Sequence, residues 1–255
     1  MEALRVEHLS KYFGGVRALH DVSFSVEAGE KLALIGPNGA GKTTLFNVLN
    51  GQLKPDAGRI YFFGQDITYL SPYKRAHLGQ ARSFQMAALF PSLTVMENML
   101  LALQGTKSSR FQMLRLYTGY NQYKAKAQKL LEFMNIWDKK DEVVGFLSHG
   151  EQKKLEIALS FAPEPKLLQL DEPSSGLTAA ESADIAGLIR SLGSNMTVIF
   201  VAHDMDLVFG LAERIVVLHY GQIIAEGTCE QIGADKKVKE IYMGIEETRG
   251  NARTG

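Results

Sequence analysis

The chain has 255 residues, of which 45% are hydrophobic and 22% are charged, and these proportions exclude a disordered or coiled-coil chain. Lysine plus arginine and aspartate plus glutamate number 28 each, so no net positive charge points to nucleic acid as a partner. One cysteine, Cys229, excludes a disulfide framework and a cysteine-based zinc finger, and it is consistent with a reducing compartment.

The first third of the chain has the pattern of short strands and one helix. Residues 4–9 and 17–26 partly alternate between apolar and polar side chains, which predicts a hairpin with one solvated face. Residues 31–35 form a more continuous apolar run, typical of a strand buried on both faces. We expect a helix over 42–50 and another strand over 59–63.

The middle of the chain differs from the two ends. From 93 to 137 the apolar spacing is helical, and strand–helix alternation returns after it. Such alternation predicts a parallel sheet with helices on its faces, into which the helical middle is inserted. The expected later elements are strands at 166–170, 197–202 and 214–219 and helices at 179–191 and 205–211.

Residues 36–43, GPNGAGKT, match the phosphate-binding pattern GxxxxGK[ST] in full. A loop that wraps a phosphate chain needs backbone N–H groups pointing inward, and glycine permits the conformations that this requires. Lys42 would reach the β- and γ-phosphates, and the Thr43 hydroxyl would bind Mg²⁺. The predicted nucleotide-binding residues are Gly36, Pro37, Asn38, Gly39, Ala40, Gly41, Lys42, Thr43 and Thr44.

The apolar run at 167–170 ends in two adjacent carboxylates, Asp171 and Glu172. Acidic pairs are common at solvated strand ends, but the carboxyl ends of parallel strands open into one crevice. Beside a complete phosphate loop, we therefore expect Asp171 to bind the Mg²⁺ held by Thr43. Glu172 would then face the water in line with the γ-phosphorus.

Two further motifs accompany the phosphate loop and the carboxylate pair. The segment 147–152, LSHGEQ, precedes the carboxylate strand, and a lone His203 follows a later strand. The whole set resembles the nucleotide-binding subunits of ABC transporters over almost the entire chain. The resemblance implies an α/β P-loop NTPase of the ABC ATPase type, with a parallel-sheet core, an N-terminal antiparallel β subdomain and an inserted helical subdomain. We expect a single domain over 1–245, with the helical subdomain at about 93–160, and a flexible tail over 246–255.

The resemblance also implies roles for residues outside the phosphate loop. Phe13 matches the aromatic residue that stacks on adenine, with Tyr12 as the second candidate and a core position in the hairpin as the alternative for Phe13. Gln85 looks like the glutamine that touches Mg²⁺ and the attacking water while its loop contacts the membrane partner; the alternative is a surface glutamine. His203 resembles the histidine that contacts the γ-phosphate.

Ser148 and Gly150 resemble the signature residues that bind ATP held on the opposite subunit. Hydrolysis would then require two subunits to close head to tail. The chain departs from the usual family pattern in two places, with His149 where a glycine is usual and Thr178 where many members have aspartate. We expect these departures to affect the flexibility of the signature turn and the communication between the two sites.

The resemblance further implies ATP and Mg²⁺ as ligands, transmembrane permease subunits and a second ATPase subunit as partners, and no nucleic acid. The segments 12–16, 81–85 and 89–98 look like those of ATPase subunits of branched-chain amino-acid importers. Urea or amide importers and lipopolysaccharide-export ATPases share much of this pattern. A P-loop kinase has no need of 147–152, and a non-transport ABC ATPase acting on nucleic acid would usually be basic or carry tandem cassettes.

The sequence predicts a protein that contacts a membrane only through its partner. The longest apolar runs are far shorter than the roughly 20 residues of a membrane span, and the first residues lack the apolar core of a signal peptide. We therefore expect a peripheral protein at the cytoplasmic face of the cell membrane. The basic stretch 107–129 would be a solvated helix face or, alternatively, a surface near anionic lipid or the permease.

Overall fold

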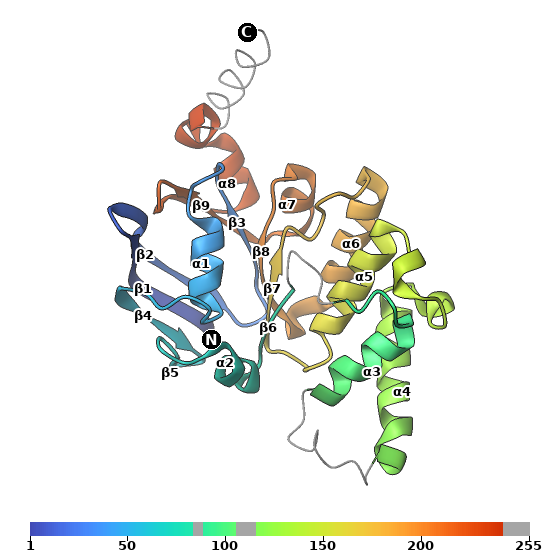
Figure 1. Ribbon diagram of the computed structural model, residues 1–255. Helices are drawn as coiled ribbons and strands as arrows, with labels where there is room; N and C mark the ends of the chain where they lie inside the picture. The colour runs from blue at the N-terminus through green and yellow to red at the C-terminus, as the bar shows by residue number, and fades with distance from the viewer. Residues whose placement is uncertain (84–88, 106–115, 242–255) are drawn as a thin grey trace.

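The computed structural model describes residues 1–83, 89–105 and 116–241 (Figure 1). The N-terminal part forms an antiparallel sheet in the order β2-β1-β4-β5. Inward-facing side chains of β1, such as Leu4 and Val6, are buried, whereas Arg5 and Glu7 on the other face are not. The predicted hairpin is confirmed, and its strands are longer than the alternating pattern. The bounds are β1 Glu2–Phe13, β2 Val16–Glu27, β4 Ala57–Phe62 and β5 Gln65–Asp66.

The second sheet has the order β10-β9-β3-β8-β7-β6, and all its neighbours are parallel except β10 and β9. Every residue of β3, β7 and β8 is buried, as expected for strands with helices or another sheet on both faces. The sequence analysis identified neither edge strand, β6 or β10. The bounds are β3 Lys31–Ile35, β6 Gln80–Arg82, β7 Leu167–Asp171, β8 Thr197–Val201, β9 Arg214–His219 and β10 Gln222–Gly227.

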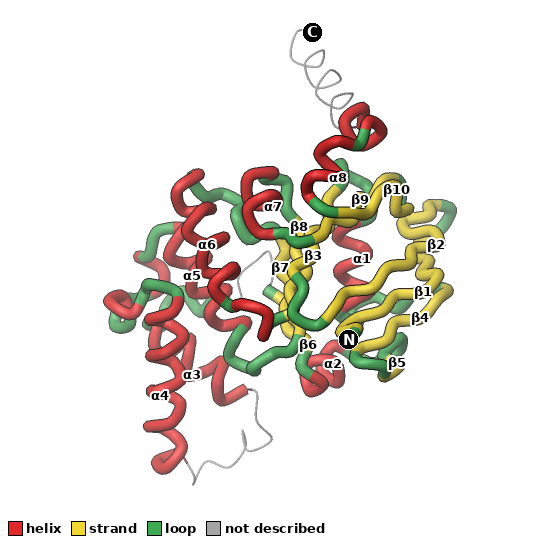
Figure 2. Tube along the Cα trace, turned by 180° about the vertical axis from the view of Figure 1, so that it is seen from behind, coloured by secondary structure: helices red, strands yellow, loops and turns green. Residues whose placement is uncertain are grey.

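The parallel sheet separates two hydrophobic cores. On one face, α1 packs between this sheet and the antiparallel sheet, with Leu45 and Phe46 fully buried. On the other face lie α5, α6 and α7, and α3 and α4 extend away from the sheets (Figures 1 and 2). The bounds are α1 Lys42–Leu49, α2 Pro72–Leu78, α3 Val95–Gly105, α4 Leu116–Phe133, α5 His149–Ser160, α6 Ala179–Ser191, α7 Met205–Leu211 and α8 Cys229–Ala234.

A buried arginine ties α2 to the end of α1. Arg75 of α2 is 1% exposed, and its Nη1 donates to the carbonyl oxygens of Val48 at 2.9 Å and Leu49 at 2.5 Å. Its Nη2 donates to the Thr68 carbonyl at 2.9 Å, and its Nε donates to the Leu70 carbonyl at 3.1 Å. Because the last carbonyls of a helix have no partner within it, the guanidinium supplies the donors that α1 itself lacks.

Some of the predicted features concern residues that the structure does not describe, and the predicted domain bounds stay predictions. Gln85, the tail 246–255 and the first part of the basic stretch 107–129 lie outside the described residues. The helices α3, α4 and α5 fall within the predicted helical subdomain at about 93–160. Among residues 1–83, 89–105 and 116–241, no helix is long and apolar enough to cross a membrane.

Candidate functional site

The phosphate loop joins β3 to α1, and two of its glycines have no room for a side chain. A Cβ at Gly36 would lie 2.1 Å from the Leu218 carbonyl oxygen, and one at Gly41 would lie 2.5 Å from the Ala18 carbonyl oxygen. Gly41 also has a φ of +104°, which other residues rarely adopt. The loop can therefore wrap closely against β2 and β9 only because these positions are glycine.

Lys42 begins α1, and its side chain turns back over the loop. Its Nζ donates to the carbonyl oxygens of Gly36 at 2.6 Å and Pro37 at 2.9 Å. Burial lowers the pKa of the Lys42 ammonium, and the negative charges of Glu172 and Asp171 partly oppose this shift. The positive charge thus lies at the N-terminal end of a helix, where an anion is favoured.

The acidic end of β7 lies near the phosphate loop, with β8 between β7 and β3 in the sheet. Glu172 has a φ of +50°, an uncommon conformation for a non-glycine residue and one that is often found at functional sites. Its N–H donates to the Val201 carbonyl at 2.9 Å, and its Oε1 lies 3.0 Å from Nε2 of His203. Because β8 lies between β3 and β7, the ends of these strands bring Glu172 and His203 beside the phosphate loop.

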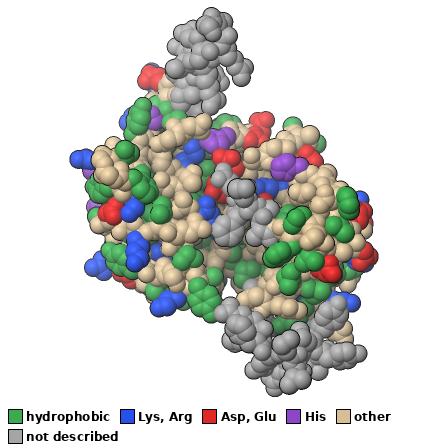
Figure 3. Space-filling view, in the orientation of Figure 1, with side chains coloured by type: hydrophobic (Ala, Val, Ile, Leu, Met, Phe, Trp, Pro, Cys, Tyr) green, Lys and Arg blue, Asp and Glu red, His purple; other side chains and the backbone are tan. Residues whose placement is uncertain are grey.

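These groups line one open cavity of about 500 Å³. Figure 3 shows acidic, basic and histidine side chains gathered near the middle of the face that carries α1. The loop contributes residues from Asn38 to Thr44, and Glu172 and His203 lie across from it. The remaining lining residues are Val16, Arg17, Ala18, Val201 and Tyr220.

Asp171 occupies a different position from its neighbour Glu172. It is 1% exposed, and it is not among the residues that line the cavity. Its Oδ2 lies 2.7 Å from Nη2 of Arg82, at the end of β6. Its negative charge nevertheless acts on Lys42, because it partly opposes the lowering of the pKa of that ammonium by burial.

The signature segment begins α5, away from the cavity. The Ser148 side chain accepts a hydrogen bond from the Glu151 N–H at 3.3 Å, and the Ser148 N–H donates to Glu151 Oε2 at 2.8 Å, which makes a capping box. Ser148 is exposed, whereas Gly150 is buried. A Cβ at Gly150 would lie 2.3 Å from Oε1 of Glu181, so this glycine makes room for the first turn of α6.

The two departures from the family pattern lie in segments that contact each other. A Cβ at Gly176 would lie 2.7 Å from Nε2 of His149, so the imidazole packs on the loop that follows β7. Thr178 caps α6, accepting from the Glu181 N–H at 3.3 Å while its own N–H donates to Glu181 Oε2 at 2.9 Å. Glu181 thus contacts both segments, because its carboxylate also abuts Gly150.

The aromatic residues near the cavity differ in part from those expected. Phe13 is 47% exposed at the hairpin turn, so it is not a core residue, and Nζ of Lys11 lies 5.6 Å from its ring centroid. Phe13 and Tyr12 are not among the lining residues, whereas Tyr220, 79% exposed in the β9–β10 turn, is one of them. Tyr220 and Arg17 are not predicted from the sequence; an aromatic residue before Gly221 at a strand end is the one signal for Tyr220.

The residues present fit a magnesium ion bound together with nucleotide phosphates. Thr43 lines the cavity, and the Asp171 carboxylate acts electrostatically on Lys42. Hydroxyl, carboxylate and phosphate oxygens are the ligands that Mg²⁺ prefers. Thr43 and Asp171 would hold the ion, and the predicted third contributor, Gln85, lies outside the described residues.

Comparisons with known proteins agree with this geometry. A family model described as ABC transporter matches residues 19–175. The chain is 37% identical to the probable branched-chain amino acid transport ATP-binding protein LivG of Methanocaldococcus jannaschii, over 96% of this chain and 98% of the relative. It is also 37% identical to the high-affinity branched-chain amino acid transport ATP-binding protein BraF of Pseudomonas aeruginosa, over 94% of this chain and 97% of the relative.

Solved structures show the same fold. The ADP conformation of an ATP-binding cassette of an ABC transporter superposes with a TM-score of 0.84 at 36% identity, covering 96% of this chain and 99% of that chain. A nucleotide-free cassette of an ABC transporter gives a TM-score of 0.82, again at 36% identity, with 95% and 99% covered. The predicted fold class is therefore confirmed. With its phosphate loop, carboxylate strand and signature segment in this arrangement, the chain belongs to the ABC transporter family as an ATP-binding cassette ATPase.

Proposed function

We propose that this ATPase powers the import of branched-chain or other hydrophobic amino acids through a membrane permease. The observation that carries the hydrolytic part is the convergence of Lys42, Glu172 and His203 on one cavity with the phosphate loop. The import of amino acids is supported by the names of relatives that align over almost the whole chain. A urea or amide importer and a lipopolysaccharide exporter are the alternatives, since the residues that bind and hydrolyse ATP do not identify the transported solute.

The residues of the cavity can divide the work of hydrolysis. Lys42 would bind the β- and γ-phosphates of ATP, and Mg²⁺ held by Thr43 and Asp171 would add positive charge there. Glu172 would orient and deprotonate the attacking water, and His203, 3.0 Å from it, would contact the γ-phosphate. Because phosphoryl transfer passes through a loose transition state, positioning and charge supply most of the acceleration. Phe13 would stack on adenine, and the exposed Tyr220 is a second aromatic candidate.

The signature residues would act on a second subunit. Ser148 is exposed at the N-terminal end of α5, where both its hydroxyl and the helix end favour a phosphate. It does not line the cavity of its own chain. We therefore infer a head-to-tail pair in which Ser148 and Gly150 of one chain cover ATP on the other.

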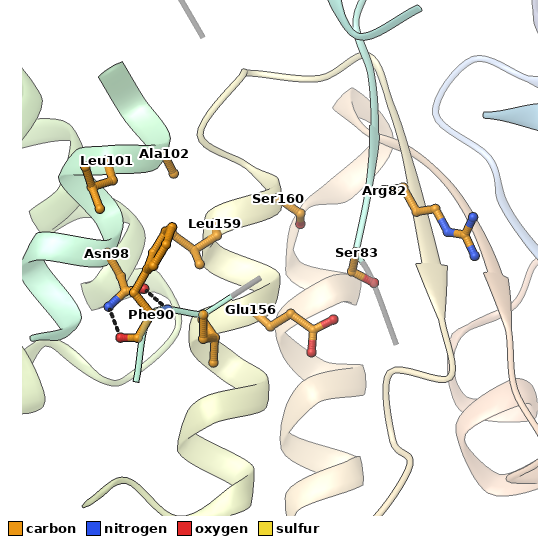
Figure 4. Close-up of a pocket in the computed structure, with 10 residues that line it drawn as sticks. Arg82, Ser83, Phe90, Asn98, Leu101, Ala102, Glu156, Leu159 and Ser160 are labelled. Carbon is orange, nitrogen blue, oxygen red and sulfur yellow. Dashed lines mark hydrogen bonds between the residues drawn. The ribbon is translucent and has the colours of Figure 1, made fainter. Parts of the chain in front are cut away.

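The permease would dock in a groove of about 410 Å³ between β6 and the helices α3 and α5 (Figure 4). Phe90 and Leu101 stand in this groove 54% and 44% exposed. Asn98 holds Phe90 in place, accepting from its N–H at 2.8 Å and donating to its carbonyl at 3.1 Å. An apolar groove with a few polar groups suits a cytoplasmic helix of a membrane protein. The chain would thereby sit at the cytoplasmic face of the membrane.

Two substitutions test the proposed chemistry. Glu172→Gln should keep ATP binding, lower turnover by about 10²- to 10⁴-fold as expected for the loss of a general base, and trap a closed dimer. Lys42→Met should weaken ATP binding by roughly 10- to 150-fold, the loss expected for a hydrogen bond to a charged group. Lys54→Met, at an exposed position outside the cavity, is the matched control. Wild-type turnover of Glu172→Gln would refute its role.

A test of the transport part uses the permease. Co-expressed with a permease of a branched-chain amino-acid importer, the wild-type chain should co-purify in a complex whose ATPase rate rises with an imported amino acid. A complex that responds to urea or an amide instead would support the alternative cargo. Phosphate transfer to a small acceptor in the absence of any dimer would instead indicate a kinase.

A further inference from the structure

Arg82 places a second positive charge on the carboxylate that is expected to bind magnesium. Its Nη2 lies 2.7 Å from Oδ2 of Asp171, and the two side chains are 10% and 1% exposed. In Figure 4 the guanidinium points away from Phe90 and Asn98, and it lies outside the group of side chains in the groove. The pair is thus nearly buried, and the Asp171 carboxylate has a protein partner before any ligand binds.

The guanidinium is held from its other side by the end of α1. Its Nη1 donates to Oδ1 of Asn47 at 2.6 Å and to Oε1 of Gln52 at 3.2 Å, and its Cζ lies 5.8 Å from the ring centroid of Phe46. Asn47 and Phe46 belong to the helix that begins at Lys42, and Gln52 follows its end. Arg82 therefore bridges the helix of the phosphate loop and the strand of the carboxylates.

The backbone reinforces this arrangement. The N–H of Ser83, the next residue, donates to the Gln169 carbonyl at 2.9 Å, and the Asp171 N–H donates to the Ser83 hydroxyl at 3.4 Å. Asp171 thus contacts the side chain of Arg82, at the end of β6, and the hydroxyl of Ser83, which follows β6. Because a buried ion pair is costly to break, the position of the carboxylate depends on Arg82.

We propose that Arg82 is a positioning residue that competes with Mg²⁺ for the Asp171 carboxylate and so sets how strongly Mg²⁺ enhances nucleotide binding. This inference rests on the proposed function, in which Asp171 helps to hold the ion. Without nucleotide, Arg82 neutralises and orients the buried carboxylate. When Mg²⁺ binds, the two cations share that carboxylate, so each lowers the affinity of the other by the same factor.

The direction of the effect follows from charge. Removing Arg82 leaves a buried carboxylate without its partner in the free protein, and Mg²⁺ then relieves that cost on binding. It also removes a positive charge that repels the ion at short range in a region of low dielectric constant. Both effects increase the gain in nucleotide affinity that Mg²⁺ produces. A merely structural role for Arg82 would lower affinity equally with and without Mg²⁺.

The experiment measures binding of ADP and of the non-hydrolysable analogue AMP-PNP by calorimetry, in EDTA and in saturating Mg²⁺. The ratio of the two affinities is the Mg²⁺ enhancement. Arg82→Gln should increase this enhancement at least about tenfold, the factor that corresponds to ~1.4 kcal/mol. Arg82→Lys keeps the charge but not the fork of donors, so its enhancement should lie between those of the wild type and Arg82→Gln. Arg59→Gln, which loses only an exposed pair with Asp66, should leave it unchanged. An equal or smaller enhancement in Arg82→Gln overturns the proposal.

Two further measurements separate this inference from its alternatives. In an Asp171→Asn background, Arg82→Gln should no longer change the enhancement, and a persistent increase would overturn the proposal. If Arg82→Gln does not fold, the side-chain Nε–H resonance of Arg82, assigned by its loss in Arg82→Lys, is followed in the wild-type protein by NMR. It should shift when Mg²⁺ is added to the nucleotide-bound protein, and an unchanged resonance overturns competition. Failure of the wild-type protein to bind nucleotide would instead refute the proposed function.

Discussion

Replacement of Arg75 by methionine tests whether one buried guanidinium holds the end of α1. Methionine fills a similar volume but has no donors, so Arg75→Met removes the guanidinium bonds to the carbonyl oxygens of four residues: Val48, Leu49, Thr68 and Leu70. Gly51 packs on the same group, since a Cβ there would lie 2.9 Å from Nε of Arg75. The substitution therefore acts on α1 from its C-terminal end while leaving the phosphate loop intact.

The expected loss of stability follows from these contacts. A hydrogen bond from a charged donor contributes about 1.5–3 kcal/mol, but the cost of burying the charge offsets much of the sum of the four bonds. Desolvation also lowers the pKa of Arg75 to about 10, because burial disfavours the charged guanidinium. Methionine avoids the cost of burying a charge, but it leaves the carbonyls of Leu49, Thr68 and Leu70 unpaired, while the Val48 carbonyl keeps its bond from the Gly51 N–H. At about 1–3 kcal/mol for each unpaired group, partly offset by the avoided burial, we expect a net loss of about 3–5 kcal/mol. For a chain of this size, that corresponds to a fall in Tm of roughly 6–20 °C.

Thermal and urea unfolding measure the loss, and Arg59→Met is the matched control. Arg59 has a side chain that is 66% exposed and pairs with Asp66 at 3.3 Å, so its loss should cost under about 1 kcal/mol. Arg75→Lys should fall between the two, since it keeps the charge but not the fork of donors. A change in Arg75→Met of less than about 1 kcal/mol would show that water satisfies the freed carbonyls and that the guanidinium is not the anchor.

Two more predictions concern the site and its surroundings. Gly41→Ala should lose most nucleotide binding in calorimetry, because its Cβ would lie 2.5 Å from the Ala18 carbonyl. Gly39 also has a positive φ, +79°, but its Cβ would meet open space, so Gly39→Ala carries the backbone strain without the clash and should lose less; equal losses would contradict the steric argument. Burial raises the pKa of Glu156, so its contribution to stability is fully present below the unfolded value of 4.5 and is lost as the pH rises through the raised pKa. The free energy of unfolding is measured in urea from pH 4.5 to neutral pH. Glu156→Gln should make it fall less steeply as the pH rises, and an unchanged slope would exclude Glu156 as the source of the fall.

The local pattern determined the elements that are regular and fully buried. The runs that form β3, β7 and β8 are apolar throughout, because a strand covered on both faces has no solvated positions. The helices α6 and α7 have the predicted bounds, since their caps Thr178 and Asp204 are side chains that act on the following turn. The phosphate loop was also predictable from the sequence, because its glycines and Lys42 act through the backbone of one short segment.

The tertiary structure decided the contacts between distant segments. Arg82 and Asp171 are 89 positions apart, and nothing near either residue indicates that β6 would lie next to β7. Tyr220 enters the cavity because the β9–β10 turn lies beside the phosphate loop, where the Gly221 N–H donates to the Ala40 carbonyl at 2.8 Å. Residue spacing along a strand or helix records which face is buried, but only the packed sheet order determines which charges share that buried space.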